Sequence, residues 1–256
     1  MLKVRVIPTL LWKDVGLVKG IGFDSWRRVG SLLPAIRVYN TRQVDELILV
    51  DITATADNHK LDLETISEMS CECFVPFTVG GGIKKVDDIK QLLRAGADKV
   101  AINSAAYDDP TIITEGAKLF GSQCIVASID AKKNKDGKYI CYSHAGKKKR
   151  NIEVSVWAKK LEELGAGEIL ITSIEKDGTM DGYDINLIKA VTNVVSIPVI
   201  ASGGAGSYED LYQAISKGKA SAVAAASIFH YTEQTPMEAK GYLHSKKIPV
   251  RINRIS

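Results

Sequence analysis

Short runs of apolar, often β-branched residues alternate along this chain with longer segments whose apolar positions recur at helical spacing. The short runs predict eight strands, at residues 4–10, 46–52, 74–79, 99–103, 124–130, 168–174, 198–202 and 220–226. Helical spacing is clearest at residues 86–95, 155–164 and 208–217, and Gly96, Gly165 and Gly218 follow these segments as C-terminal stops. Such alternation is typical of βα units and predicts a parallel sheet.

The pattern also repeats itself within the chain. Residues 46–49 (ELIL) are echoed at 168–171 (EILI), and residues 76–78 with Gly81 and Gly82 are echoed at 198–200 with Gly203 and Gly204, each 122 positions later. A duplication of four βα units explains both the eight strands and the offset, whereas an open doubly wound sheet explains only the alternation. We therefore expect an α/β fold, a single (β/α)8 TIM barrel domain over residues 1–256 built from two similar half-barrels.

Composition narrows the classes of function. The chain has 256 residues, 45% of them hydrophobic, and a net charge of only +4. The basic run at residues 147–150 is not interleaved with aromatic residues, so we interpret it as a solvated loop and expect no nucleic-acid binding. The spacing of the four cysteines fits neither a disulfide scaffold nor a metal site. We expect no metal and no cofactor.

The same features bear on localisation. The N-terminal apolar run is too short for a signal peptide, and no stretch nears the roughly 18 apolar residues that a membrane span needs. The cysteine usage is typical of a reducing compartment. We therefore expect a soluble, cytoplasmic protein with no membrane partner.

Polar and small residues gather where the predicted strands end, which is the face that carries the chemistry in a (β/α)8 barrel. Asp130 ends the fifth strand and shares a face with Val126 and Ser128 by the two-residue period of a strand. The first strand is the exception, because it ends in Leu10 and Leu11. The other strand ends carry Asp51, Gly80 to Gly82, Asn103 with Ser104, Thr172 with Ser173, Ser202 to Gly204, and Ser227.

Two glycine-rich turns follow the third and seventh strands, and each is followed one unit later by a small polar strand end. Glycines there let backbone N–H groups approach an anion. One such turn alone would be explained by a tight chain reversal, but two turns related by the same offset predict a ligand with two phosphates. The candidate contacts are Gly81, Gly82, Asn103, Ser104, Gly203, Gly204, Ala226 and Ser227, with Asp177 and Gly178 in a further polar turn.

A second group of charged residues lies at the opposite strand ends. Arg5, Glu46, Lys99 and Glu168 open strands one, two, four and six. If these residues face inward, two positive and two negative charges ring the bottom of the barrel and can pair, as burial requires. The ring would be either a structural salt-bridge plug or a gate to a channel through the barrel, and the pattern alone leaves both open.

The whole chain resembles the cyclase subunit of imidazole glycerol phosphate synthase. The residues that carry the resemblance are 77–83 (FTVGGGI), 96–100 (GADKV), 128–132, 165–173, 177–179 (DGT) and 200–206. It implies a (β/α)8 barrel whose N-terminal face docks a glutaminase subunit, with ammonia passing the gate toward a bisphosphorylated substrate at the other face. It also implies that the gate is formed by Arg5, Glu46, Lys99 and Glu168, that Asp98 lies in the interface, and that Lys19 on the first loop covers the substrate.

The chain departs from the family pattern at one catalytic position. The family's chemistry uses two aspartates as general acid and base, at the ends of strands one and five. The second corresponds to Asp130, but the first falls on Leu11, which cannot exchange a proton. Losing a positioned acid–base group typically lowers the rate roughly 10²- to 10⁴-fold. Asp14 matches a separate acidic residue of the family and is not a substitute.

This departure leads to three hypotheses. The first is a specialised paralogue that takes ammonia from a glutaminase for amidation of a surface-polysaccharide sugar, with a sugar amidotransferase as a third protein. The alternative is a genuine cyclase of histidine biosynthesis. The last is a non-catalytic barrel that binds and activates the glutaminase.

Overall fold

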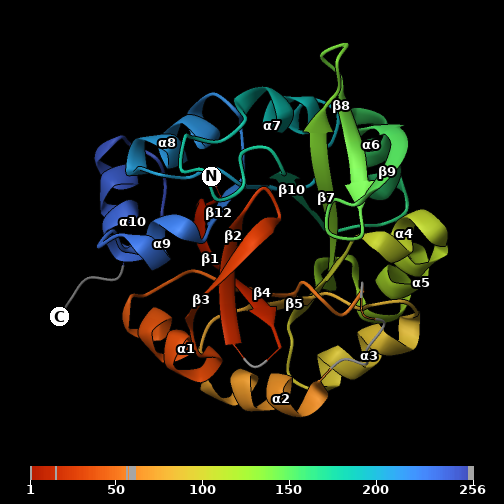
Figure 1. Ribbon diagram of the computed structural model, residues 1–256, viewed down its shortest axis with the longest axis horizontal. Helices are drawn as coiled ribbons and strands as arrows, with labels where there is room; N and C mark the ends of the chain where they lie inside the picture. Colours follow the sequence, from red (N-terminus) through yellow and green to blue (C-terminus); the bar gives the residue numbers. More distant parts are fainter. Residues whose placement is uncertain (1, 15, 56, 58–61, 253–256) are drawn as a thin grey trace.

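The computed structural model describes residues 2–14, 16–55, 57 and 62–252. Within them, eight parallel strands form a closed barrel, because each pairs with the next and the last pairs with the first (Figure 1). The predicted (β/α)8 TIM barrel is therefore confirmed. In order around the barrel, the strands are β1 (Arg5–Lys13), β4 (Leu47–Asp51), β5 (Phe77–Gly80), β6 (Lys99–Ile102), β7 (Ile125–Lys133), β10 (Glu168–Ser173), β11 (Val199–Ser202) and β12 (Ala222–Ala225).

Helices surround the barrel (Figure 1). The longer ones are α1 (Leu32–Thr41), α2 (Leu63–Glu72), α3 (Val86–Arg94), α5 (Thr111–Phe120), α6 (Val154–Glu163), α7 (Ile185–Thr192), α8 (Tyr208–Ser216) and α10 (Pro236–Ser245). Short helices α4 (Ser104–Asp108) and α9 (Ser227–Tyr231) and the 3₁₀ turn η1 (Ser122–Cys124) complete the described helices. None of the helices in the described part of the chain is long and apolar enough to span a bilayer.

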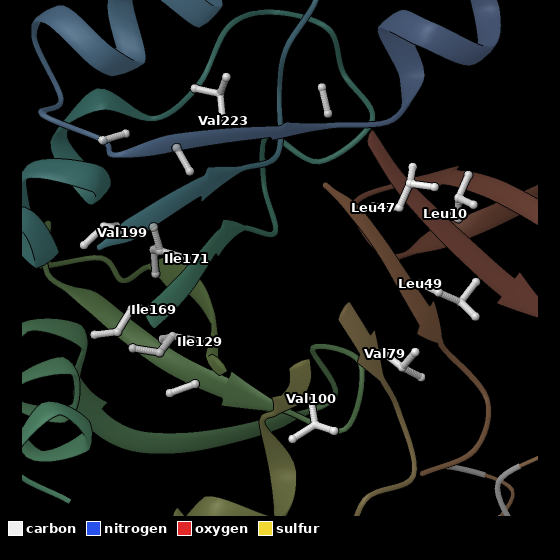
Figure 2. Packing of buried hydrophobic residues seen from close by; sticks show 14 of the residues in the cluster. Leu10, Leu47, Leu49, Val79, Val100, Ile129, Ile169, Ile171, Val199 and Val223 are labelled. Atoms are coloured by element: carbon white, nitrogen blue, oxygen red, sulfur yellow. The ribbon is translucent and has the colours of Figure 1, made fainter. Parts of the chain in front are cut away.

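Two apolar layers follow from strand alternation. The outer layer lies between the strands and the helices, and Figure 2 shows side chains such as Leu10, Leu49 and Ile129, which belong to this cluster. The inner layer fills the barrel lumen with residues of the opposite parity: Ile7, Ile48, Ala101, Val126, Leu170, Ile200, Ala222 and Ala224. The buried apolar residues of the barrel strands are thus divided between the helix interface and the lumen.

The backbone repeats the duplication seen in the sequence. Gly81 and Gly203 both adopt a left-handed conformation, with φ of +101° and +91°. The N-cap residues of α3 and α8, Lys85 and Ser207, have nearly identical angles, with φ −144° and ψ 164° and 163° respectively. The two halves thus share their turn geometry, as the 122-residue offset predicted.

Two antiparallel hairpins were missed by the prediction. Strands β2 (Gly16–Ile21) and β3 (Asp24–Gly30) follow β1, while β8 (Tyr139–Ser143) and β9 (Lys148–Glu153) follow β7. Residues 148–150 therefore lie in a strand and not in a loop, which corrects our interpretation of the basic run. The side chains of Lys148 and Lys149 are exposed and all three side chains are polar, so the segment lacks the apolar alternation by which a strand is recognised.

The end of α8 also differs from the prediction. The left-handed residue there is Lys219, with φ +63°, and not Gly218. Gly218 is required for another reason, because a Cβ at this position would lie 2.4 Å from the carbonyl oxygen of Ala214. Gly96 and Gly165 do adopt left-handed φ values, of +104° and +101°, after α3 and α6.

Candidate functional site

A cavity of about 160 Å³ opens at the C-terminal ends of the barrel strands. Its walls come from both halves of the chain, and its floor is formed by lumen residues such as Ala101, Leu170 and Ala224. The predicted site residues Lys19, Gly81, Gly82, Asn103, Ser104, Asp130, Asp177, Gly178, Gly203, Gly204, Ala226 and Ser227 all line it, together with Leu11. Convergence of the strand ends thus brings these residues together.

Asp130 lies on the inner face of β7, and its carboxylate Oδ2 accepts a hydrogen bond of 2.8 Å from the Asn103 side-chain amide. Burial raises the pKa of Asp130 to about 7, and the negative charge of Asp177 acts in the same direction, while the Asn103 hydrogen bond opposes the rise. Near neutral pH the carboxyl group therefore exists in both protonation states. That is the condition for efficient general acid–base catalysis.

Leu11 occupies the corresponding position at the end of the first strand. It lines the same cavity and pairs with Val18 of β2 and Val50 of β4. Both of these register partners are apolar, and the side chain of Leu11 itself has no group that can transfer a proton. Asp14 lies in the turn between β1 and β2, outside the residues that line this cavity. Asp130 thus has no carboxylate at the strand-one position to share the proton transfers.

The first glycine turn lies close against a neighbouring strand end. Gly81 has a left-handed φ of +101°, and a Cβ there would lie 2.1 Å from the carbonyl oxygen of Asp51. Only glycine fits, and its backbone N–H is left uncovered by a side chain. Beside this turn, Oδ1 of Asn103 is buried and has no hydrogen-bond partner among the described residues.

The second turn has the same features. Gly203 and Gly204 have φ of +91° and +111°, and a Cβ on Gly204 would lie 2.2 Å from the carbonyl oxygen of Gly182. The hydroxyl of Ser227, which is 4% exposed, has no partner among the described residues. Buried polar atoms are nearly always hydrogen-bonded in folded proteins. The orphan atoms of Asn103 and Ser227 therefore mark two places where a ligand would complete the site.

The β2–β3 hairpin lies across the mouth of the barrel (Figure 1). Lys19 is only 2% exposed, and its ammonium lies 2.7 Å from Oδ2 of Asp177. The backbone N–H of Gly22 donates to the Asp177 carbonyl over 2.9 Å. The hairpin is thus fixed to the turn after β10 by a charged and a backbone contact. We call residues 16–30 the lid.

The prediction missed cavity residues that lie in the two hairpins. Phe23 and Trp26 of the lid, and His144 and Ala145 between β8 and β9, line the cavity. Thr9, one position below Leu10 on β1, lines it as well, and its buried hydroxyl lacks a partner among the described residues. The sequence signal for the lid contacts was the pair of aromatic residues Phe23 and Trp26, which follow the apolar residues Leu17, Val18 and Ile21.

The four charged residues at the opposite barrel end form a closed ring. Arg5 contacts Glu46 at 2.6 Å and Glu168 at 3.0 Å, and Lys99 contacts both carboxylates at 3.0 Å. Burial would lower the pKa of Arg5, but hydrogen bonds and charge from Glu168 and Glu46 raise it above its ordinary value. The guanidinium therefore stays charged. Thr78 adds a 2.8 Å hydrogen bond to the other oxygen of Glu46.

Asp98 lies on the same face as this ring and is exposed. Its carboxylate accepts a 2.8 Å hydrogen bond from the backbone N–H of Phe77, and its own N–H donates to the Phe77 carbonyl. The side chain is therefore held in place at the N-terminal face next to Lys99.

Comparison with known proteins agrees with this geometry. The family model described as "Histidine biosynthesis protein" matches residues 5–235. The chain is 50% identical over 252 residues to imidazole glycerol phosphate synthase subunit HisF of Dehalococcoides mccartyi, covering 98% of this chain and 99% of that protein. The chain belongs to the HisF family. HisF subunits of Chlorobium phaeovibrioides and Chlorobaculum parvum are each 47% identical over 252 residues, covering 98% of this chain and all of theirs.

Membership over nearly the full length places the barrel among cyclase-type subunits of imidazole glycerol phosphate synthase. The resemblance inferred from the motifs is therefore confirmed. Within this HisF-family barrel, Leu11 at the cavity wall remains the feature that sets the expected chemistry in question.

Proposed function

We propose that this HisF-family barrel is a cytoplasmic synthase subunit that receives ammonia from a glutaminase at its N-terminal face and uses it on a phosphorylated ligand in the C-terminal cavity. The observation that carries the proposal is the placement of Asp130 and both glycine turns in one cavity. Below that cavity, the lumen is lined by small and apolar residues and ends at the charged ring. Asp98, exposed beside the ring, would contact the glutaminase.

The comparisons favour cyclisation to imidazole glycerol phosphate over a specialised role, since the relatives that share 47–50% of their residues carry that name. Under this function, Asp130 exchanges protons with the substrate. The two phosphates would be held by the turns at Gly81–Gly82 with Asn103 and Ser104, and at Gly203–Gly204 with Ser227. Lys19 would hold the lid closed over them.

One observation favours a second candidate. Leu11 leaves the strand-one position without an acid, and its neighbours Val18 and Val50 do not replace it. A paralogue that delivers ammonia to a different acceptor, such as a surface-polysaccharide sugar handled by a separate amidotransferase, does not need the second aspartate. A barrel that only activates the glutaminase would not need Asp130 to titrate near neutral pH.

The test is turnover of the histidine-pathway bisphosphate substrate with ammonium as the nitrogen donor. The purified chain should be compared with Leu11→Asp and with Leu11→Asn, which has the shape of aspartate but cannot exchange its proton. Cyclisation by the unmodified chain that Asp130→Asn abolishes would establish the cyclase function. Absence of turnover in the unmodified chain, with a rise of roughly 10²-fold or more in Leu11→Asp alone, would establish a changed reaction.

The two remaining outcomes are also informative. Turnover at equal rates in all three Leu11 forms would show that the strand-one acid is dispensable here, against our reasoning on this position. If no form turns over with ammonium, yet the chain stimulates a HisH-type glutaminase, the activating barrel is supported. An Asp98→Lys variant should weaken that stimulation if Asp98 lies in the interface, and unchanged stimulation would exclude this role.

A further inference from the structure

His144 is a titratable cavity residue to which the proposed function assigns no role. It lies in the turn between β8 and β9 and lines the cavity together with Ser104 and Asp130. Its backbone N–H donates a 3.1 Å hydrogen bond to the hydroxyl of Ser104. The turn is therefore joined to the first phosphate-binding segment, although the two are 40 residues apart.

The backbone conformation at His144 is costly for this sequence. His144 and Ala145 have φ of +55° and +53°, and Gly146 follows with +76°. Such left-handed values are uncommon outside glycine, and histidine, like asparagine and aspartate, is enriched among the residues that adopt them. Strained residues of this kind cluster at functional sites, where the surrounding structure holds them in place. A histidine is compatible with this turn, and the turn places it at the cavity wall.

Two partly buried hydrogen bonds fix one nitrogen of the imidazole ring. The Arg150 guanidinium, which can only donate, contacts the Ser143 hydroxyl oxygen at 2.6 Å. Ser143 is fully buried, and Nδ1 of His144 lies 3.0 Å from the same oxygen. Because the Ser143 hydroxyl accepts from Arg150 and has no other acceptor for its own hydrogen among the described residues, we assign that hydrogen to Nδ1, which places the proton of the neutral ring on Nε2.

Arg150 also contacts the helix that begins at Ser104. It donates to Asp108 at 2.8 Å and lies 4.9 Å from the ring centre of Tyr107, both on α4. This helix begins at Ser104, so Arg150 connects the turn to the helix that follows Asn103. Burial lowers the pKa of His144, and the nearby charges of Arg150 and Lys148 lower it further, so the free protein carries a neutral ring at neutral pH.

The second ring nitrogen is left for a ligand. Among the described residues, Nε2 of His144 makes no hydrogen bond, and it is not among the buried polar atoms that lack a partner. We propose that His144 contacts the phosphorylated ligand through its Nε2–H and extends the Ser104 side of the cavity, with Ser143 and Arg150 as positioning residues. The proposal rests on the proposed function in one respect, which is that the ligand is phosphorylated.

Histidine-selective ¹⁵N labelling tests the ring state directly, because the chain has only four histidines. The His144 resonance is identified by its loss in His144→Asn. It should show a protonated Nε2 and an accepting Nδ1, and Ser143→Ala should convert this to a mixture of tautomers. A protonated Nδ1 in the unmodified protein would overturn the assignment of the positioning residues.

Inorganic phosphate tests the contact. Saturating phosphate should shift the His144 ring resonance. The Kd for phosphate should be determined from the chemical-shift changes of the backbone amides of Gly82 and Ser104. His144→Asn should weaken that Kd about tenfold, the usual effect of losing one hydrogen bond to a charged group. Asparagine tolerates the left-handed turn, so thermal stability should be kept. His144→Gln, whose amide nitrogen can replace Nε2, should recover part of the affinity.

Two controls make the outcome decisive. Phosphate binding reported by the amides of Gly204 and Ser227 should not change in His144→Asn, and exposed His244→Asn on α10 should leave both sites unaffected. The proposal is overturned if His144→Asn binds phosphate with the original Kd at Gly82 and Ser104. It is equally overturned if no saturable phosphate binding occurs there. Neither result depends on turnover. The proposed function can therefore be refuted while the His144 contact is confirmed, and the His144 contact can be refuted while the proposed function is confirmed.

Discussion

The raised pKa of Asp130 predicts a specific dependence of stability on pH. In the folded protein this carboxyl group has a pKa of about 7, compared with an ordinary value of 3.8, mainly because it is buried and secondly because of the charge on Asp177. In the unfolded chain it titrates near the ordinary value. Between the two values the folded state therefore holds a proton that the unfolded state has released.

The sign follows from this difference in bound protons. Where the folded state binds more protons than the unfolded state, stability falls as pH rises. The contribution of Asp130 is thus fully present below about pH 4 and is lost progressively up to about pH 7. Roughly three pH units at about 1.4 kcal/mol each give a loss of about 4 kcal/mol, to order of magnitude.

Substitution of Asp130 by asparagine should remove this loss. The side-chain oxygen of asparagine can still accept from Asn103, which now bonds to Oδ2 at 2.8 Å, so the packing is preserved. Urea unfolding at pH 4, 5.5, 7 and 8 should show nearly equal stability for the two proteins at pH 4. At pH 8 the variant should be more stable, by up to about 4 kcal/mol.

A matched control separates this effect from the general titration of the protein. Glu115→Gln removes one carboxylate from the exposed face of α5 and should leave the pH dependence of the unmodified chain intact. If the stability difference between Asp130→Asn and the unmodified chain were the same at every pH, Asp130 would not be the titrating group. A difference that grows toward acid would reverse the sign and refute the reasoning entirely.

Three further predictions concern the ring and the lid. Thr78→Val removes the hydroxyl that donates to buried Glu46 and should cost about 1–3 kcal/mol in urea unfolding. Lys19→Met would leave the Asp177 carboxylate without its cation, so the lid should open to hydrate it, seen as faster chymotrypsin cleavage within residues 16–30. Gly178→Ala should also speed that cleavage, because its Cβ would lie 2.1 Å from the lid backbone.

These predictions have controls within the chain. Gly137 also has a left-handed φ, of +81°, but a Cβ there would come no nearer than 3.8 Å to another group, so Gly137→Ala should leave cleavage of the lid unchanged. Lys135→Met, at the exposed tip of the β7–β8 hairpin, is the control for Lys19→Met. Equal cleavage rates for the test and control variants would contradict the assigned lid contacts. Thr192→Val is the control for Thr78→Val, because it removes a hydroxyl that donates to the Gly218 carbonyl. It shows how much stability is lost when any threonine hydrogen bond is removed, without a buried carboxylate as the acceptor.

The position of Asp130 illustrates how far the sequence goes. The two-residue period of a strand predicted that its side chain shares a face with Val126 and Ser128. The predicted (β/α)8 barrel put the end of that strand at the C-terminal mouth. The structure agrees, since Ser128 and Asp130 both line the cavity. The pKa of Asp130, however, depends on burial and on Asp177, which is 47 positions further along the chain. A pattern of neighbouring residues therefore does not predict this pKa shift.

The lid and the His144 turn were beyond prediction for a related reason. Their strands pair with the projecting ends of β1 and β7, and buried Leu17 and Cys141 join the core between the barrel and the helices. The contact between Lys19 and Asp177 spans 158 positions, and the contact between His144 and Ser104 spans 40. Both arise only when the barrel has closed and its loops have been brought to one end.

The resemblance to the cyclase subunit identified the missing acid at Leu11. The sequence by itself determined the eight barrel strands, the duplication and the four charges at the strand starts. These features are written in local periodicity and in residue identity, because each strand must commit alternate side chains to the lumen and to the helices. Only the tertiary structure decided which groups meet across the cavity: the closed lid, the near-neutral pKa of Asp130 and the bonded ring of His144. Each of these depends on burial and on contacts between distant segments, which a linear pattern does not specify.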